Sequence, residues 1–207
     1  GHSLGEYTAL CAAKSIKISD AAKLLRIRGK AMQDCDKDNS GAMAAILGLS
    51  FEKIQEIVEN VSDATACQVA NDNDPAQVVI SGHKEAVNKA IDLAKKTGAK
   101  RALQLNVSAP FHSYMMAPAT HEMRSALSSI RITKPLVPIV MNVLAKDVTK
   151  PDLIRQFLID QVANMVRWRE SIMFMTQKGV QRFFELGEGK ALSGMVRRTS
   201  TTVQTIN

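Results

Sequence analysis

The chain opens on Gly-His-Ser-Leu-Gly-Glu-Tyr at residues 1–7, a Gly-x-Ser-x-Gly turn that runs directly into a stretch of helical composition. Such a strand-to-helix turn is a nucleophile elbow, which exposes the hydroxyl of its serine, here Ser3, and points backbone N–H groups at one spot. Glycines two positions before and after the serine, Gly1 and Gly5, let the turn close without Cβ clashes. Glycine and serine are also common in ordinary turns, so the motif alone is equally consistent with a structural turn.

Size and composition predict a globular chain. With 207 residues and 45% hydrophobic content, it can bury a substantial core as one domain or one domain with an insertion. No apolar run approaches the ~18 residues of a membrane span, and the start lacks the regions of a signal peptide. We therefore expect no membrane association and a cytoplasmic location. The three cysteines are widely separated and lack C-x-x-C spacing, which predicts free thiols and neither a disulfide framework nor a zinc site.

The charge balance indicates anionic partners without specifying them. The formal net charge is +7, but aromatic residues are only 4% of the chain, and no basic tract is interleaved with them. Nucleic acid is therefore not expected, whereas a phosphate-bearing cofactor or an acidic protein explains the charge at least as well. An ordinary solvated basic surface remains an equal alternative.

An arginine interrupts the apolar face of the second predicted helix. Ser19-Asp20 offers an N-cap for a helix over residues 21–35, where Ala21, Leu25, Arg28 and Met32 fall on one face. Arg28 is either a structural residue, snorkelling or paired with a carboxylate, or a guanidinium held in place to bind a carboxylate bidentately. Residue type and spacing favour the structural alternative.

Residues 41–105 change character and predict an inserted subdomain. Strands are expected over 41–49, 66–70, 77–81 and 101–107, helices over 51–61, after a Ser50 cap, and 84–97, and a turn over 71–75. The order βαββαβ is that of the ferredoxin-like unit. We predict an α/β protein in which a body of residues 1–40 and 106–207 carries a lid of residues 41–105.

A second candidate for chemistry follows the lid. His112 lies in a proline-containing loop after the last lid strand, and although a lone loop histidine is more often a satisfied surface group, Ser3 provides a partner for it. His83 has no partner motif and is interpreted as structural. The turn at residues 187–189 could cradle a phosphate, but two glycines between strand and helix are commoner as plain geometry. Further body helices are expected over 115–128, 152–162, 170–179 and 190–198, and strands over 137–143 and 180–186.

The elbow string resembles the nucleophile motif of malonyl-CoA:acyl carrier protein transacylases and related acyltransferase domains. Other strings along the chain resemble the same family: Arg28-Gly-Lys-Ala-Met-Gln33, Gly41-Ala-Met-Ala-Ala45, Gln77-Val-Val-Ile-Ser-Gly82, Gly98-Ala-Lys-Arg101, Pro110-Phe-His112, Gln161-Val-Ala-Asn164 and Glu185-Leu-Gly187. The resemblance implies that Ser3 is the nucleophile, that His112 is the base, oriented by a backbone carbonyl near Gln161, and that Arg28 binds the malonyl carboxylate.

The resemblance also implies the surroundings of this site. The backbone N–H of Leu4 would contribute to the oxyanion hole, and His2, Met32 and Phe111 would line the pocket, with Phe111 narrowing it against a branched acyl group. The body would be a hydrolase-like parallel sheet. We expect no metal and no resident cofactor, with the coenzyme A thioester as substrate, an acidic acyl carrier protein as partner, and a monomer.

The implied activity is acyl transfer in fatty-acid biosynthesis. A malonyl group would move from coenzyme A to the phosphopantetheine thiol of the carrier through an ester on Ser3, with ping-pong kinetics. A histidine pKa near neutrality suits both proton transfers. Because thioesters are reactive acyl donors, a carbonyl that fixes the imidazole tautomer would suffice in place of an aspartate.

The family has a segment upstream of the elbow that this chain does not show, so we expect the chain to be an N-terminally truncated fragment of a longer protein. Two alternatives to the transacylase remain. One is a serine thioesterase or esterase that uses the same Ser3 and His112, although such a pocket has little use for a cation at Arg28. The other is a non-catalytic fragment that binds coenzyme A or the carrier protein through its basic surface.

Overall fold

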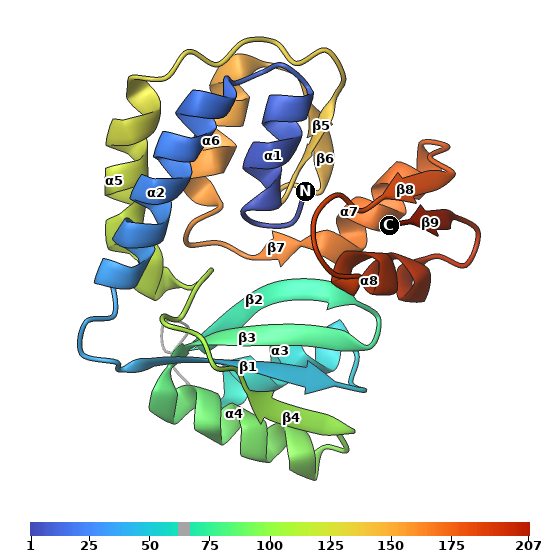
Figure 1. Cartoon of the computed structure of the whole chain (residues 1–207). Coiled ribbons are helices and arrows are strands. Elements are labelled where there is room, and N and C mark those ends of the chain that lie inside the picture. Colours follow the sequence, from blue (N-terminus) through green and yellow to red (C-terminus); the bar gives the residue numbers. More distant parts are fainter. Residues whose placement is uncertain (62–66) are drawn as a thin grey trace.

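The computed structural model describes residues 1–61 and 67–207, and it is a mixed α/β structure in which body helices stand over the open face of a sheet (Figure 1). The body elements up to residue 160 are α1 (Gly5–Ala12), α2 (Ile18–Asp34), the 3-10 turn η1 (Tyr114–Met116), α5 (Ala117–Ser128), β5 (Ile139–Met141), β6 (Lys146–Val148) and α6 (Pro151–Asp160). The C-terminal elements are β7 (Val166–Arg167), α7 (Trp168–Gln177), β8 (Arg182–Phe184), α8 (Ala191–Thr199) and β9 (Gln204–Ile206).

The body is built around one apolar core. Helices α1, α2 and α5 contribute the fully buried side chains of Tyr7, Leu24 and Met123, and α6 contributes Leu158. Burying a side chain of this size stabilises the fold by roughly 1.5–3 kcal/mol. This core holds α1, which directly follows Ser3, and α2, which carries Arg28, in place.

The lid has the predicted βαββαβ order, with β1 (Gly41–Leu47), α3 (Phe51–Val61), β2 (Cys67–Asp74), β3 (Gln77–His83), α4 (Lys84–Lys96) and β4 (Arg101–Gln104). Residue 66, the first of a predicted strand, lies outside the described residues. The strand order is β4-β1-β3-β2-β7, and β3 pairs antiparallel with both β1 and β2. As predicted, Ser50 caps α3, its Oγ accepting from the Lys53 N–H at 3.3 Å.

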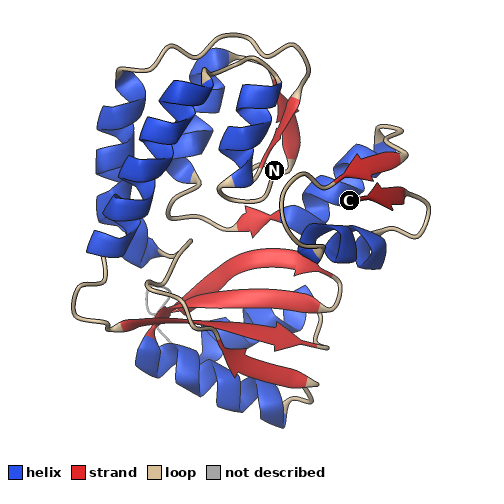
Figure 2. Cartoon of the chain, viewed as in Figure 1, coloured by secondary structure: helices blue, strands red, loops and turns tan. Residues whose placement is uncertain are grey.

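The two faces of the lid sheet pack against different partners. Helices α3 and α4 cover the face that carries Ala44, Ile46 and Ile80 (Figure 2). The opposite face carries Met43, Ala45 and Val79, and Phe111 of the body packs against this second cluster. The lid therefore presents a small apolar face to the loop that precedes His112.

One strand of the lid sheet comes from the body. β7 extends the sheet beyond β2, pairing in parallel through Asn71 with Val166 and Asp72 with Arg167. The sequence did not predict this two-residue strand, because its pairing depends on a segment more than ninety residues away.

Several predicted boundaries were wrong. The strands predicted over 101–107, 137–143 and 180–186 are shorter, at Arg101–Gln104, Ile139–Met141 and Arg182–Phe184, and two other boundaries differ for an identifiable reason. The helix predicted to start at residue 21 begins at Ile18, with Lys17 at the N-cap and no side-chain cap, so Ser19 and Asp20 lie inside its first turn. The turn predicted over 71–75 is instead the end of β2, which continues to Asp74. Ion pairs of Asp72 and Asp74 with body arginines stabilise the extended conformation, so tertiary contacts override the turn preference of Asn and Asp.

The α/β class is confirmed, but the body sheets of the described residues are small. β5 pairs antiparallel with β6, and β8 pairs in parallel with β9. Within the described part of the body, parallel pairing is thus limited to β8 and β9. Two short strands are too few for the predicted parallel-sheet body. No helix in residues 1–61 or 67–207 is long and apolar enough to cross a membrane.

Candidate active site

Ser3 lies on a strained turn at the start of α1. Its φ of +47° falls in the left-handed region, which is uncommon for a residue with a side chain and frequent at functional sites. A Cβ on Gly1 would lie 1.9 Å from the Gly5 carbonyl oxygen, so the first glycine of the elbow is sterically required. A Cβ on Gly5 would meet nothing within 4 Å. The prediction that both glycines prevent Cβ clashes is therefore right for Gly1 and wrong for Gly5.

Ser3 and His112 are in direct contact, as predicted. The Ser3 Oγ lies 2.8 Å from the Nε2 of His112, whose own φ of +56° is also left-handed. The Nδ1 of His112 lies 2.9 Å from the main-chain oxygen of Gln161. Because a carbonyl can only accept, Nδ1 carries the proton and Nε2 is left as the acceptor for the serine hydroxyl. This is the tautomer that a general base needs.

Arg28 lies at the same point, on the buried face of α2 and only 7% exposed. Its Nη2 donates to the Ser3 Oγ at 2.9 Å and to the Gln161 Oε1 at 3.0 Å, while its buried Nε has no partner. Within the described residues Arg28 forms no ion pair. Burial lowers the pKa of this guanidinium. The site thus holds a desolvated cation with unused donors beside the serine oxygen.

The electrostatics keep His112 neutral. Burial, and next the nearby Arg28 cation, lower the pKa of His112 to about 3, so the expected pKa near neutrality was wrong. Burial also lowers the pKa of His2, the residue that precedes Ser3. An imidazole that is neutral at pH 7 can accept the serine proton at once, and a carboxylate bound at Arg28 would offset the cation that depresses its basicity.

A polar network that the sequence did not predict holds the elbow. The Asn142 Oδ1 accepts from the Ser3 N–H at 2.7 Å, and its Nδ2 donates to the Gly1 carbonyl at 2.8 Å. The Gln161 Nε2 donates to the Ser3 carbonyl at 3.0 Å. Buried Glu6 accepts from the Asn142 N–H and from the Gln161 Nε2. The sequence carried no signal for this network, because the burial of Glu6 is evident only from the structure.

The lid positions the histidine loop and the start of the elbow. The Gln68 Nε2 of β2 donates to the His112 carbonyl at 3.3 Å, and its Oε1 accepts from the Tyr114 N–H at 2.9 Å. The Nε2 of His2 donates to the Asn73 Oδ1 at 3.0 Å, and the His2 ring meets Trp168 edge-on at 5.4 Å between centroids. The site therefore lies where body and lid meet.

The remaining predicted site residues in this part of the structure are Leu4, Met32 and Phe111. Leu4 is the N-cap of α1, 54% exposed, and its N–H has no acceptor among the described residues. Met32 belongs to the body core at 2% exposure, on the α2 face that carries Arg28. Phe111 is half-buried between the body core and the lid. The pocket-lining and oxyanion roles of these residues remain predictions.

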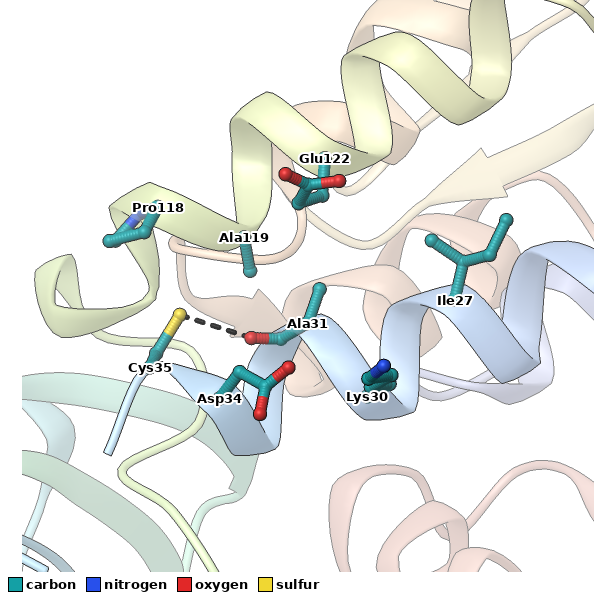
Figure 3. A pocket seen from close by; sticks show the side chains of 8 residues that line it. All are labelled: Ile27, Lys30, Ala31, Asp34, Cys35, Pro118, Ala119 and Glu122. Carbon is teal, nitrogen blue, oxygen red and sulfur yellow. Dashed lines mark hydrogen bonds between the residues drawn. The ribbon is translucent and has the colours of Figure 1, made fainter. Parts of the chain in front are cut away.

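The cysteines and a pocket between α2 and α5 lie outside the group of residues around Ser3. Cys11, Cys35 and Cys67 are free thiols, as predicted. Residues 1–61 and 67–207 contain no group of three or more His, Cys, Asp or Glu side chains that could hold a metal ion. A pocket between α2 and α5 is lined by Ala31, Cys35, Pro118 and others (Figure 3), but it shares none of the residues around Ser3. In it the Cys35 thiol donates to the Ala31 carbonyl at 3.2 Å.

Comparison with known proteins identifies the family. The acyl transferase domain model matches residues 1–206. The malonyl CoA-acyl carrier protein transacylase of Escherichia coli K12 is 43% identical over 203 residues, which are 98% of this chain and 66% of that protein. The corresponding Bacillus subtilis protein is 42% identical over 207 residues, covering 100% of this chain and 65% of that protein.

Solved structures of proteins with the same kind of name are also similar to this chain. The acyl-carrier-protein-S-malonyltransferase of Bartonella henselae superposes with a TM-score of 0.96 at 46% identity, covering 99% of this chain and 65% of that one. A malonyl-transacylase in complex with its type II PKS acyl-carrier protein has a TM-score of 0.96 at 41% identity, covering 99% and 66%. The chain spans about two thirds of the length of the relatives it matches. With this similarity along its whole length, the chain belongs to the acyl transferase domain family.

Proposed function

We propose that the protein transfers a malonyl group from coenzyme A to the phosphopantetheine thiol of an acyl carrier protein, through an ester on Ser3. Relatives with 36–43% identity carry the name malonyl CoA-acyl carrier protein transacylase, which supports this proposal. In it coenzyme A is a substrate, and no resident cofactor takes part.

The observation that carries the proposal is the position of Arg28. Its Nη2 lies 2.9 Å from the Ser3 Oγ, and its Nε is buried without a partner. A buried cation with free donors is costly unless a ligand supplies the counter-charge. A dicarboxylic acyl group bound to Ser3 would place its free carboxylate near this guanidinium, where a bidentate pair can form.

In the first half-reaction, the Ser3 Oγ attacks the thioester carbonyl of malonyl-CoA. The new O–C bond forms as the serine proton passes to the His112 Nε2. The tetrahedral oxyanion lies next to the N-terminus of α1, where the free Leu4 N–H is available as a donor. The C–S bond then breaks, and His112 returns the proton to the departing coenzyme A sulfur.

The second half-reaction runs the same steps in reverse with a new thiol. The carrier's phosphopantetheine sulfur gives its proton to His112 and attacks the malonyl ester. The C–O bond to Ser3 breaks, and the serine oxygen regains the proton. The net charge of +7 suits an acidic carrier protein.

The test is intact mass spectrometry of the protein after incubation with malonyl-CoA. We expect a covalent malonyl adduct on the wild-type protein, its loss in Ser3→Ala, and its transfer when a phosphopantetheine thiol is added. Circular dichroism of Ser3→Ala controls for folding. Rapid release of free malonate without a thiol acceptor would identify a thioesterase instead, and an adduct that survives in Ser3→Ala would place the nucleophile elsewhere.

A further inference from the structure

Glu6 is a buried carboxylate that the mechanism above does not use. It follows Ser3 by three residues, on the inner side of α1, and has no exposed surface. No described residue forms an ion pair with it at salt-bridge distance. Instead, each carboxylate oxygen accepts from a different N–H group. A carboxylate is retained in such a place only where its hydrogen bonds offset its desolvation.

One carboxylate oxygen of Glu6 stabilises the backbone of the elbow through Asn142. The Glu6 Oε1 accepts from the Asn142 backbone N–H at 2.6 Å. The side chain of Asn142 in turn spans the turn on both sides of His2, accepting from the Ser3 N–H and donating to the Gly1 carbonyl. Fixing the backbone of Asn142 therefore fixes the side chain that maintains the strained φ of Ser3.

The second oxygen sets the direction of an amide. The Glu6 Oε2 accepts from the Gln161 Nε2, so the Gln161 Oε1 must point the other way, toward the Arg28 Nη2 at 3.0 Å. A flipped amide would place an NH₂ group against the guanidinium and an oxygen against the carboxylate, two repulsive contacts. The Ser3 carbonyl accepts from the same Nε2 at 3.0 Å, so Glu6 and this carbonyl together give Arg28 an acceptor at its position beside Ser3.

We propose that Glu6 is a positioning residue for acyl selection, because it orients the Gln161 amide that holds Arg28 beside the Ser3 hydroxyl. This inference rests on the proposed function, in which Arg28 binds the acyl carboxylate. Glu6 touches neither Ser3 Oγ nor His112 and acts only through its two partners. Its removal should therefore affect a carboxylated acyl donor more than an uncharged one.

The first variant is Glu6→Gln, which keeps the shape but replaces one acceptor oxygen by a donor. Acyl-enzyme formation is measured at pH 8 in single turnover from malonyl-CoA and from acetyl-CoA. We expect the malonyl rate to fall ~10–100-fold, the size of a lost hydrogen bond to a charged group, and the acetyl rate to fall at most about threefold. Glu85→Gln, an exposed position in the first turn of α4, is the matched control and should change neither rate.

The second variant keeps Glu6 and removes its route to Arg28. Gln161→Met retains the backbone carbonyl that orients His112 but has no amide, so it should reproduce the loss of malonyl preference. Because both changes interrupt the same contacts to Arg28, the double variant should lower the malonyl-to-acetyl rate ratio no further than Gln161→Met alone, whereas the contact of Glu6 with Asn142 should affect both donors alike. A further fall of this ratio in the double variant, or an equal fall of both acyl donors in Glu6→Gln, would overturn the proposal.

A measurement that does not depend on catalysis tests the positioning role of Glu6 independently of the proposed malonyl transfer. In ¹H–¹⁵N spectra, Glu6→Gln should shift the Gln161 side-chain amide and the Arg28 Nε–H, and Glu85→Gln should shift neither. Unchanged resonances would refute the positioning role even if the enzyme is active. If wild-type protein forms no malonyl ester while these resonances do shift, the proposed function fails and the contact relay from Glu6 to Arg28 stands.

Discussion

Replacing Arg28 by alanine tests how much of the malonyl preference comes from one guanidinium. The Nη2 of Arg28 contacts Ser3 and Gln161, and its Nε has no partner in the described structure. A carboxylate bound in bidentate geometry would gain two charge-assisted hydrogen bonds, each worth about 1.5–3 kcal/mol. Together they amount to ~3–6 kcal/mol, or ~10²–10⁴-fold in rate at ~1.4 kcal/mol per factor of ten. Arg28→Ala should therefore slow malonyl-ester formation by that factor.

The same substitution should leave acetyl transfer unchanged or improve it. An acetyl group leaves the guanidinium desolvated and unpaired, a mismatch that Arg28→Ala removes. The Arg28 cation also contributes to the low pKa of His112, so its loss makes this histidine a stronger base. Arg28→Lys should recover only part of the preference, because a point charge lacks the planar fork of donors.

The assay is acyl-enzyme formation from malonyl-CoA and acetyl-CoA, measured side by side by intact mass. The ratio of the two rates isolates the carboxylate contact from general damage to the site. If both rates fall by the same factor in Arg28→Ala, Arg28 is a structural residue, and the substrate assignment loses the observation that carries it.

Two further predictions concern stability. His112 has a folded pKa of about 3, below its ordinary 6.5, and Glu6 has one of about 7, above its ordinary 4.5, with burial the largest cause in both. The contribution of His112 to the free energy of unfolding therefore rises as pH rises from 3 to 6.5, whereas the contribution of Glu6 falls as pH rises from 4.5 to 7. The two contributions cancel between pH 4.5 and 6.5. In His112→Asn only the contribution of Glu6 remains. Between pH 4.5 and 6.5 the variant's free energy of unfolding, measured with urea, should therefore fall by ~1.4 kcal/mol per pH unit relative to wild type. An equal pH dependence of the two proteins would refute the low pKa of His112. Arg169→Gln leaves Asp72 buried and unpaired and should cost ~3 kcal/mol, whereas Asp72→Asn leaves an arginine that can reach water and should cost about 1; a reversed order in urea unfolding would contradict this.

The parts of the fold that sequence predicts are those with a local signal. The strand and helix periods of residues 41–105 predicted the βαββαβ order, which the structure confirms. The elbow string and Pro110-Phe-His112 carry the family resemblance that implied the pairing of Ser3 with His112, at 2.8 Å in the structure. In each case a few adjacent residues carry the signal, because turn geometry and apolar periodicity are properties of short segments.

The network around Ser3 has no local signal. Glu6 and Gln161 are 155 positions apart, and Ser3 and Asn142 are 139 apart. A glutamate in a short helix is ordinarily a surface residue, so its type gave no reason to expect burial. The predicted role of Gln161 concerned only its backbone carbonyl, whereas in the structure its side-chain amide also connects Glu6 to Arg28. Such contacts follow from packing two helices and two loops together, not from any one segment.

The polar end of β2 shows why tertiary contacts also decide the local structure. Asp72 and Asp74 bind Arg169 of α7 and Arg198 of α8, and Asn73 between them accepts from His2. A buried carboxylate without a partner costs several kcal/mol, so this segment can be an extended strand only when both helices are docked on it. That docking also places Asn73 against the residue before Ser3. The position of the elbow relative to the lid therefore depends on the C-terminal helices, although no residue of α7 or α8 contacts the Ser3 hydroxyl within the described structure.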